Sequence, residues 1–294
     1  MIDRLATRMK DVVRDQPVPS RAQFMRANLL AHQGKIAEAA RVFKEANAAK
    51  HSEISAEVTA ESHSWQGTWD TPNPPPLAGR RPGDMPFEVL LLLGPTRSGK
   101  SSVEQALAGD PSVLPRYEAI NFGLLRAHGP EDLARLPTEE RGGLLRQALY
   151  LSRVTQDQLA GRIVVCTNPN LVHVVPALLA LVGRLNIVWI DRGGPGHMAD
   201  IFASDYVDGN FYAYDIDNIT SYLSAYAKRM SELMKALPDQ AIRVAFADFL
   251  NDPAAQIGRI AALVGRPLVQ GGVPDAAAAR RHCAYTEDLA RHLL

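Results

Sequence analysis

The sequence predicts an α/β fold in which helices flank a mostly parallel sheet, preceded by a small N-terminal helical hairpin. Continuous apolar runs at Val89–Leu93, Ile163–Cys166 and Ile187–Ile190 are typical of parallel strands that are buried on both faces. Helical patterns lie between these runs, and strands that alternate with helices indicate successive βαβ units. A glycine-bounded loop, Gly94–Ser101, follows the first run directly and leads into a helical pattern.

Residues 1–65 are expected to be helical and to form a segment of their own. Between Arg26 and Lys50, small and apolar residues recur at helical spacing on either side of Gly34. This pattern predicts a helical hairpin, either a general α-hairpin or a single tetratricopeptide-like repeat. One repeat cannot bury its apolar face alone, so we expect the hairpin to pack on the rest of the chain or on a protein partner.

The segment 66–86 is interpreted as a linker between the hairpin and the α/β domain. It contains six prolines and three glycines, which exclude a regular element. The domain that follows is expected to span residues 87–294. Its further elements are predicted as helices at Ser101–Ala108, Ile219–Leu237 and Ala254–Val264 and a fourth strand at Ala241–Ala247.

The composition argues against several classes of protein. Lysine and arginine together number 32, as do aspartate and glutamate, so no net charge favours nucleic acid as a partner. The two cysteines, Cys166 and Cys283, are too few for a disulfide framework. The N-terminus is charged without an apolar core behind it, and apolar stretches such as Val174–Val182 are too short to span a membrane. We expect a cytoplasmic protein.

The loop Gly94–Ser101 has the pattern Gly-x-x-x-x-Gly-Lys-Ser between a predicted strand and a predicted helix, which is the context of a phosphate-binding loop. Its glycines let successive backbone N–H groups point inward, and the helix adds its positive end. Lys100 would place a full charge near the terminal phosphate. Ser101 would hold a magnesium ion or donate to a phosphate oxygen. The predicted ligand is a nucleotide.

A nucleoside-triphosphate enzyme also needs an acidic residue at the end of a neighbouring strand to organise Mg²⁺. Asp191 and Asp248 each close a predicted strand, although strand-terminal aspartates are also common helix caps. His173 and His197 lack a partner at metal-ligand spacing and are interpreted as structural residues. No metal site built from protein side chains is predicted.

Several motifs in order resemble the sulfotransferase family. Pro95–Gln105 with Gly109–Val113 is similar to the family's 5′-phosphosulfate loop, its apolar-Glu-Gln helix and the short motif that follows. Asn210–Tyr226 resembles the family's Ala-Tyr-Asp-Leu-Glu-Asp-Ile stretch, and Phe246–Pro253 resembles its Tyr-Glu-Asp-Leu-x-x-Asp-Pro. The bacterial branch that fuses a tetratricopeptide segment to the sulfotransferase domain matches best.

This resemblance implies transfer of a sulfuryl group from 3′-phosphoadenosine-5′-phosphosulfate (PAPS) to a hydroxyl acceptor. It implies that Glu118 is the catalytic base, with an exposed loop carboxylate as the alternative. It also implies that Arg192 grips the 3′-phosphate, with a surface salt bridge as the alternative. The residues expected to hold the 5′-phosphosulfate are Arg97, Ser98, Gly99, Lys100, Ser101 and Ser102.

The departures from the family pattern concern mainly the 3′-phosphate side. Lys100 stands where the family has a threonine, and Asp200 stands where a serine holds the 3′-phosphate. Cys166–Pro169 replaces the usual Asp-Lys-x-Pro, so a lysine that assists the leaving group is missing. Lys100, at a helix N-terminus, could compensate as a catalytic residue. The basic segment that closes over the nucleotide is reduced to Arg280–Arg281.

Three hypotheses about function follow. The first is a sulfotransferase that uses PAPS. The second is a kinase or hydrolase on the same fold that uses ATP or GTP with Mg²⁺ through Lys100 and one strand-end aspartate. The third is a non-catalytic descendant that acts through its hairpin as an interaction module. The acceptor is left open among a protein tyrosine, a sugar hydroxyl and a small metabolite.

Overall fold

The computed structural model describes residues 19–55, 85–206, 209–272 and 276–294. The chain divides into two compact units. The sheet unit comprises residues 85–192 together with the stretch from Ala225 to Ala279, and the hairpin unit comprises the described residues before 56, Gly193–Ser224 and Arg280–Leu294. The predicted linker lies outside the described residues except for Met85 and Pro86. The predicted domain boundaries at 65 and 87 therefore stay a prediction.

The core of the sheet unit is a parallel sheet of five strands in the order β2-β3-β1-β4-β5. In the register, Leu91 of β1 lies beside Cys166 of β3 on one side and Ile187 of β4 on the other. The strands with two neighbours are almost wholly buried, which explains their continuous apolar runs. The strands are β1 (Glu88–Leu93), β2 (Val113–Pro115), β3 (Ile163–Cys166), β4 (Asn186–Asp191) and β5 (Ala241–Ala245).

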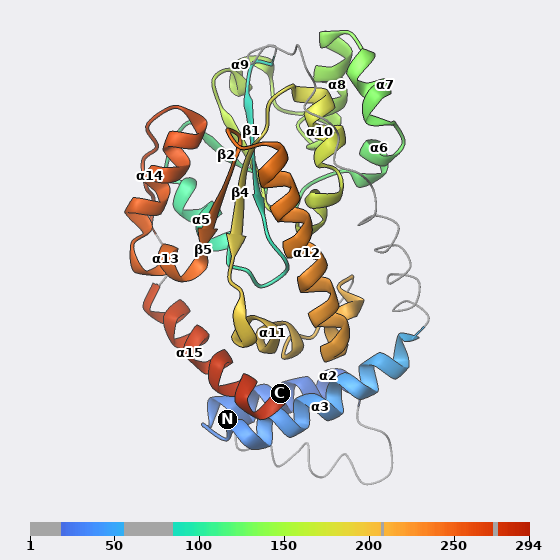
Figure 1. Cartoon of the computed structure of the whole chain (residues 1–294), viewed down its shortest axis with the longest axis vertical. Helices are drawn as coiled ribbons and strands as arrows, with labels where there is room; N and C mark the ends of the chain where they lie inside the picture. The colour runs from blue at the N-terminus through green and yellow to red at the C-terminus, as the bar shows by residue number, and fades with distance from the viewer. Residues whose placement is uncertain (1–18, 56–84, 207–208, 273–275) are drawn as a thin grey trace. The chain divides into compact units, whose positions relative to one another are not determined.

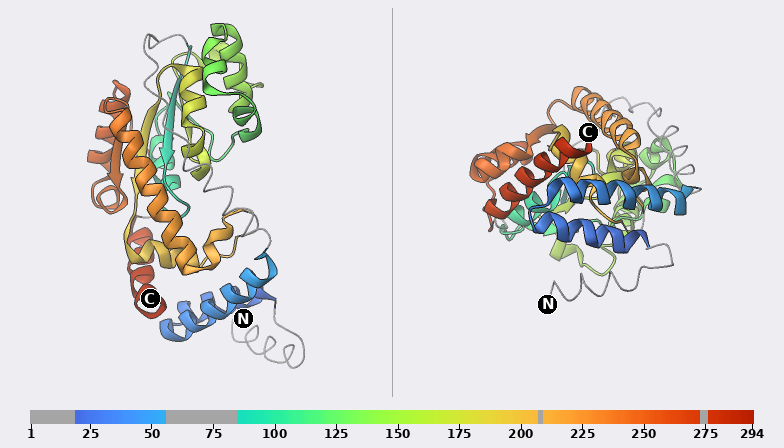
Figure 2. Two further views of the ribbon diagram at one scale, coloured as in Figure 1. Left: turned by 45° about the vertical axis from the view of Figure 1, so that its right-hand side comes forward. Right: turned by 90° about the horizontal axis from the view of Figure 1, so that it is seen from below.

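Helices cover both faces of this sheet (Figures 1 and 2). On one face, α5 (Lys100–Leu107) packs on β1 and β2, and α14 (Pro253–Val264) packs on β4 and β5. On the other face lie α10 (Val175–Val182) and the later turns of α12 (Ile216–Ala236). The change of face follows from right-handed crossovers, because the chain moves outward in opposite directions from β1 to β2 and from β3 to β4.

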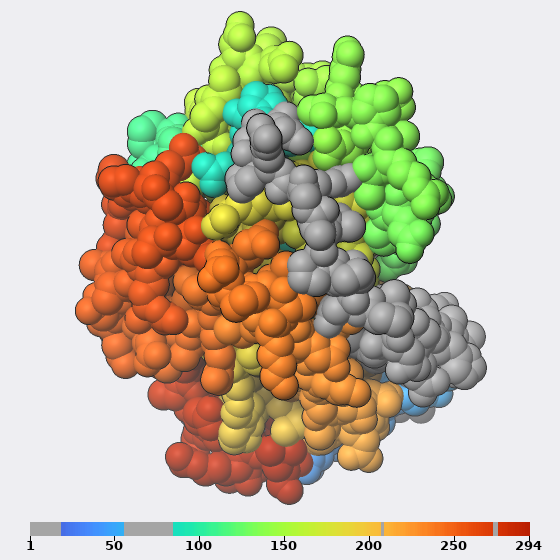
Figure 3. Space-filling view, turned by 45° about the horizontal axis from the view of Figure 1, so that its top comes forward, coloured from blue at the N-terminus to red at the C-terminus, as the bar shows by residue number. Residues whose placement is uncertain are grey.

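Smaller elements complete the sheet unit. Between β2 and β3 the chain forms a group of short helices, and the residues of α7 and α8 lie on the opposite side of the start of β1 from those of α14 in the space-filling view (Figure 3). These elements are α6 (Phe122–Arg126), α7 (Pro130–Arg135), α8 (Thr138–Ala148) and α9 (Gln156–Leu159), with the 3₁₀-helix η1 (Pro169–His173) after β3 and α13 (Phe246–Asn251) after β5.

The hairpin unit is built on two helices, α2 (Ser20–His32) and α3 (Ile36–Glu53), which pack against each other. Gly34 takes a left-handed φ of 76° in the turn between them, as the predicted hairpin requires. The other elements of this unit are α11 (Gly194–Phe202), the 3₁₀-helix η2 (Phe211–Tyr214), the first turns of α12 and most of α15 (Ala276–Leu293).

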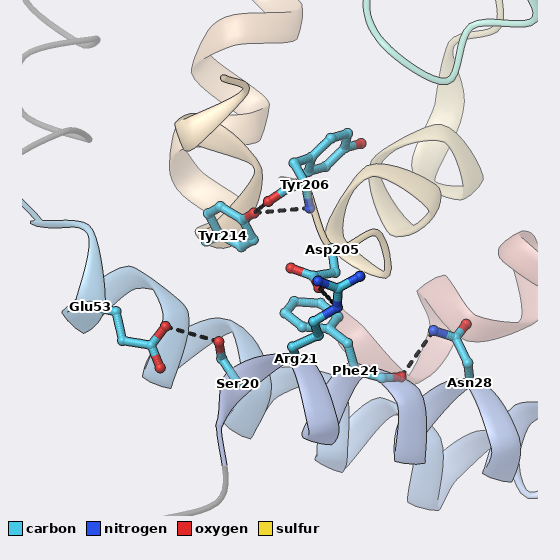
Figure 4. A network of polar contacts seen from close by, with 8 residues as sticks. All are labelled: Ser20, Arg21, Phe24, Asn28, Glu53, Asp205, Tyr206 and Tyr214. Atoms are coloured by element: carbon cyan, nitrogen blue, oxygen red, sulfur yellow. Dashed lines mark hydrogen bonds and ion pairs between the residues drawn. The ribbon is translucent and has the colours of Figure 1, made fainter. Parts of the chain in front are cut away.

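The hairpin packs on later parts of the chain within its own unit. Phe24 contacts Phe43 of α3 and Tyr214 of η2, with ring centroids 6.2 Å apart in both pairs. Asn47 of α3 donates its side-chain amide to the carbonyl of Phe202 at the end of α11, at 2.8 Å. Figure 4 shows the polar contacts around Phe24, where the hydroxyl of Tyr214 bonds the backbone of residue 206. The hairpin therefore buries its apolar face on its own chain.

The predicted α/β fold class is confirmed, with four of the five strands at their predicted places. The strand predicted to end at Ala247 ends at Ala245, because Phe246–Asn251 turns into α13. The strand β2 and the helix α15 were not predicted. Among the described residues, no helix combines the length and apolar character that crossing a membrane requires.

Candidate functional site

The site is the loop between β1 and α5, at the carboxyl end of the central strand. Gly99 has a φ of 97°, and a Cβ there would lie 2.3 Å from two ring carbons of Phe246. A Cβ on Gly94 would lie 2.7 Å from the carbonyl oxygen of Ile190 and closer still to Ser98. Both glycines of the motif are therefore required by close approach of other atoms, and Gly99 also by its backbone conformation.

Three backbone amides in this loop are available to a ligand. The N–H groups of Gly99, Lys100 and Ser101 donate to no acceptor within the described part of the chain. They sit at the start of α5, where the first amides of a helix lack intrahelical acceptors and the helix presents its positive end. Ser101 is exposed beside them, whereas Ser98 is buried. This arrangement suits an anion such as a phosphate or a sulfate.

Lys100 is folded back into the loop. Its Nζ donates to the carbonyl oxygens of Gly94 at 2.9 Å and Pro95 at 2.7 Å, and only 6% of the residue is exposed. Burial lowers the pKa of Lys100 to about 7, against the opposing effect of the Glu118 charge. The ammonium group is thus poised near neutral pH, where a bound anion would favour its charged form.

Glu118 lies in an exposed turn just after β2, within electrostatic reach of Lys100. The backbone of this turn is tied to two neighbours. The N–H of Tyr117 donates to Glu104 Oε1 of α5 at 2.8 Å, and the N–H of Thr167 donates to the carbonyl oxygen of Tyr117 at 3.0 Å. The structure therefore places Lys100 and Glu118, the two residues predicted to be catalytic, within range of each other's charge.

Arg192 follows β4, the strand next to β1, and reaches the loop. Its guanidinium donates to the carbonyl oxygen of Arg97 at 3.0 Å. Arg97 itself is exposed and has a left-handed φ of 61°. Arg192 therefore lies next to the loop, and its role in gripping the 3′-phosphate, with a surface salt bridge as the alternative, stays a prediction.

The two aspartates considered as magnesium organisers are differently placed. Asp191 Oδ2 accepts a hydrogen bond from Arg243 Nε at 2.8 Å and a second, shorter contact from the same guanidinium. Asp248 belongs to α13 and is exposed, rather than closing a strand. Across the described residues, no group of three or more His, Cys, Asp or Glu side chains is placed to hold a metal ion.

Asp200 lies in α11 of the hairpin unit with its carboxylate engaged. Asp200 Oδ2 is 2.9 Å from His282 Nε2 on α15, and 3% of Asp200 is exposed. Tyr285 lies on α15, as His282 does. Burial raises the pKa of Tyr285 to about 12, and the charge of Asp200 adds to this rise. The basic pair Arg280–Arg281 also belongs to α15.

Sequence reasoning missed one residue that shapes the loop. The buried hydroxyl of Tyr226, on α12, accepts the N–H of Gly94 at 2.8 Å and donates to the carbonyl oxygen of Pro169 at 3.1 Å. It ties the start of the loop to the segment after β3. Other tyrosines of this region pack on one another, as in the stack of Tyr212 on Tyr222. No local pattern singles out Tyr226, because its partners lie far away in the sequence.

The histidine and cysteine near the sheet are not reactive groups. Burial, with the charges of Arg126 and Arg229, lowers the pKa of His173 to about 4, so its ring is neutral at physiological pH. Burial raises the pKa of the Cys166 thiol to about 12. The neutral ring agrees with the structural role predicted for His173, and the buried thiol behaves as a small apolar side chain.

A parallel sheet whose central strand enters a helix through a glycine-bounded loop with free amides defines an α/β protein of the P-loop type. Within that class the chain belongs to the sulfotransferase family, because the model of the sulfotransferase family matches residues 90–270. The protein is therefore a transferase. A comparison with curated proteins found no match.

Similar solved structures are bacterial sulfotransferases of low sequence identity. The sulfotransferase domain of the Synechococcus PCC 7002 olefin synthase is 17% identical, with a TM-score of 0.45 over 70% of this chain and 94% of that one. A sulfotransferase from Alicyclobacillus acidocaldarius is 15% identical, with a TM-score of 0.43 over 73% and 94%. A sulfotransferase from Mycobacterium tuberculosis is 13% identical, with a TM-score of 0.42 over 100% and 98%. The family assignment rests on the match over residues 90–270.

Proposed function

We propose that this sulfotransferase moves a sulfuryl group from PAPS to a hydroxyl acceptor, with Glu118 and Lys100 as its catalytic residues. The observation that carries the proposal is the shared location of three features at one edge of the sheet: the free amides of Gly99 to Ser101, the buried Lys100 and the Glu118 turn. An anion cradle, a titratable lysine and a carboxylate are what sulfuryl transfer requires.

The residues of the loop fit the 5′-phosphosulfate of the donor. The free amides and the hydroxyls of Ser101 and Ser102 would hold its oxygens, with Ser98 lining the loop from inside and Arg97 at the rim. Arg192, which reaches the loop from β4, would hold the 3′-phosphate. Asp200 belongs to the hairpin unit, where its carboxylate Oδ2 lies 2.9 Å from His282 Nε2, and it is given no role in holding the donor.

The catalytic roles follow from the chemistry of these groups. The bound donor supplies an activated sulfuryl group. Glu118, exposed in its turn, accepts the proton of the acceptor hydroxyl as a general base. Lys100 and the amides at the start of α5 neutralise the negative charge that develops on the oxygen next to the 5′-phosphate. Because the lysine titrates near neutral pH, it can take the charged form when that negative charge appears.

The nucleoside-triphosphate hypothesis finds less support. Its Mg²⁺ would need a strand-end aspartate, and Asp191 is engaged by Arg243 while Asp248 sits on an exposed helix. The proposal also includes a cytoplasmic location. The buried Cys166 and the absence of a disulfide among the described cysteines suit a reducing compartment.

Calorimetric titration of adenosine 3′,5′-bisphosphate, compared with ATP and GTP in the presence of Mg²⁺, tests the donor. We expect the bisphosphate to bind, with affinity lowered roughly ten- to hundredfold in Lys100→Met and in Arg192→Ala through lost charge-assisted contacts. Arg184→Ala is the matched control, because Arg184 precedes β4 whereas Arg192 follows it. Binding of ATP or GTP without binding of the bisphosphate would contradict the proposed donor and favour a kinase or hydrolase. If none of the three ligands binds, the result favours a non-catalytic protein.

Turnover is measured as release of adenosine 3′,5′-bisphosphate from PAPS in the presence of simple alcohols and phenols. We expect Glu118→Gln to lose turnover by roughly 100-fold or more, as is typical when a general base is removed. Its bisphosphate affinity should stay unchanged, because Glu118 is not assigned to the nucleotide. Equal turnover in wild type and Glu118→Gln would contradict the assignment of the base.

A further inference from the structure

We propose that Glu104 is a positioning residue that fixes the turn carrying Glu118 and so couples that turn to the helix carrying Lys100. The inference rests on the proposed function, since it concerns Glu118 as the base. The inference gives a role to the buried carboxylate of Glu104, which the proposed function assigns neither to donor binding nor to proton transfer.

The first argument is the contact itself. Glu104 projects from α5, four residues after Lys100, so the two residues lie on the same side of the helix. Its Oε1 accepts the backbone N–H of Tyr117 at 2.8 Å, one residue before Glu118, and only 6% of Glu104 is exposed. A single helix therefore carries Lys100 and holds the backbone next to Glu118.

The second argument is the backbone conformation that this bond maintains. Tyr117 has a φ of 50°, a left-handed conformation that is unusual for a bulky residue. Its side chain does not account for this, because 58% of the residue is exposed to solvent. The conformation persists because its neighbours impose it, and strained residues of this kind cluster at functional sites. Here Glu104 holds the N–H of Tyr117, and Thr167 holds its carbonyl oxygen.

The third argument is electrostatic. Burial raises the pKa of Glu104, the hydrogen bond from Tyr117 opposes that rise, and the nearby charge of Glu118 adds to it. The bond from the Tyr117 N–H therefore offsets part of the cost of burying Glu104 beside a second carboxylate. The positioning role needs only an acceptor oxygen at this place, which an amide also supplies.

A second buried carboxylate on the same stretch provides a matched control. Asp110 is also 6% exposed, and it accepts backbone N–H groups from Ser112 at 2.8 Å and Val269 at 2.7 Å. It therefore resembles Glu104 in burial and in type of bond. Its partners lie at the start of β2 and after α14, and neither adjoins Glu118 in the sequence. Removing Asp110 should disturb stability without moving the Glu118 turn.

The experiment compares Glu104→Ala, Glu104→Gln and Asp110→Ala in the full chain. Peptide-level hydrogen exchange follows residues 116–119, and calorimetry follows adenosine 3′,5′-bisphosphate. Donor turnover is measured with simple phenols at saturating PAPS. We expect Glu104→Ala to speed exchange at 116–119 and to lower kcat roughly ten- to hundredfold, as misplacement of a catalytic group does, with bisphosphate affinity kept within about twofold. Glu104→Gln should restore most of both, because its amide oxygen can accept the Tyr117 bond.

The outcomes separate this inference from the proposed function. If Glu104→Ala keeps its kcat or its exchange rate while Glu118→Gln is inactive, Glu104 has no positioning role and the proposed function stands. If Asp110→Ala lowers kcat as strongly as Glu104→Ala, or Glu104→Gln is as impaired as Glu104→Ala, the effect is general instability or charge, and the inference is overturned. If the wild-type protein neither binds the bisphosphate nor turns over PAPS, the proposed function fails and this inference fails with it.

Discussion

Substitution of Gly99 by alanine tests whether the loop geometry depends on close approach as well as on backbone freedom. Gly99 has a φ of 97°, a region that residues with a Cβ rarely adopt. The new Cβ would also lie 2.3 Å from two ring carbons of Phe246, far inside van der Waals contact. Phe246 is 6% exposed and stacks on Phe249 with the centroids 6.3 Å apart, so its ring has little room to move.

The two effects can be estimated separately. A left-handed backbone costs a residue with a Cβ about 1–2 kcal/mol. Overpacking a filled core by one methyl group costs typically about 1–3 kcal/mol, because neighbours must shift or leave their preferred rotamers. Gly99→Ala should therefore lower the free energy of unfolding by about 2–5 kcal/mol. Because the shift would also displace the free amides at residues 99–101, bisphosphate affinity should fall by at least about tenfold, which corresponds to roughly 1.4 kcal/mol.

Urea denaturation gives the free energy of unfolding of Gly99→Ala and of Gly265→Ala. The difference between the two losses measures the cost of the contact between the new Cβ at residue 99 and the Phe246 ring. Gly265 ends α14 with a φ of 73°, and a Cβ there meets nothing within 4 Å, so its substitution carries the backbone cost alone, about 1–2 kcal/mol. The bisphosphate affinity of Gly265→Ala should be unchanged. The double variant Gly99→Ala, Phe246→Leu should recover part of the loss. Equal destabilisation by Gly99→Ala and Gly265→Ala would refute the reasoning, because it would mean that the Phe246 ring yields at no cost.

Three further predictions concern the loop and the hairpin unit. Tyr226→Phe removes the hydroxyl that bridges Gly94 and the segment after β3, so the free energy of unfolding in urea should fall by about 1–3 kcal/mol; an unchanged value would show that water replaces the bridge. Because burial lowers the pKa of Lys100 to about 7, the lysine is mostly neutral at pH 8 in the free protein, and an anion raises its pKa. Bisphosphate binding at pH 8 should therefore take up close to one proton, on the order of 0.5–0.9, measured by calorimetry in buffers of different ionisation heat and absent in Lys100→Met. His282→Ala removes a partner of the buried Asp200 carboxylate and should cost about 1–3 kcal/mol in urea, most of it recovered in the double variant with Asp200→Asn.

The linkage of Lys100 to stability has a definite sign. Its pKa in the folded chain lies below the ordinary value of 10.5, so the folded state binds fewer protons than the unfolded state between about pH 7 and 10.5. The contribution of Lys100 to the free energy of unfolding therefore rises with pH through this window and is lowest, and constant, below pH 7. Lys100→Met should lack this rise. Urea denaturation of the wild type and of Lys100→Met at several pH values measures this rise. A rise in the wild type alone indicates a lysine that is buried in the free protein, and its absence indicates a lysine that is already in solvent.

The sequence predicted the central sheet because parallel strands buried on both faces carry continuous apolar runs. The same pattern gave a wrong strand end after β5. The apolar run continues through Phe246, but the backbone turns into α13 at that residue. Short apolar runs do not distinguish strand from helix, and only tertiary packing decides between them. The strand β2 went unpredicted because it has three residues, Val113–Pro115, and ends in a proline. Such a strand has no periodicity to detect, and it forms because β3 offers a partner.

Some residues of the site can be predicted from a local motif, whereas others depend on contacts with distant parts of the chain. The loop from Gly94 to Ser101 could be predicted because its motif is defined by the types and spacing of a few adjacent residues. Glu118 entered only through the family resemblance, since an exposed carboxylate in a turn has no pattern of its own. Glu104 and Tyr226 act through contacts with residues 13 and 132 positions away, respectively. Contacts of that kind appear only when the chain is folded.

The register of the sheet bears on the lysine that the resemblance to the sulfotransferase motifs leads us to expect after β3. Thr167 stands at that position, directly after Cys166, and its hydroxyl is buried without a hydrogen-bond partner in the described part of the chain. Leu91 of β1 lies beside Cys166, so the loop that carries Lys100 leaves the sheet at the same edge as Thr167. The positive charge that the resemblance leads us to expect at the end of β3 can therefore be supplied by Lys100 from the start of α5, which follows the neighbouring strand. This placement agrees with the catalytic role proposed for Lys100 and with the sulfuryl donor proposed as the ligand of the loop.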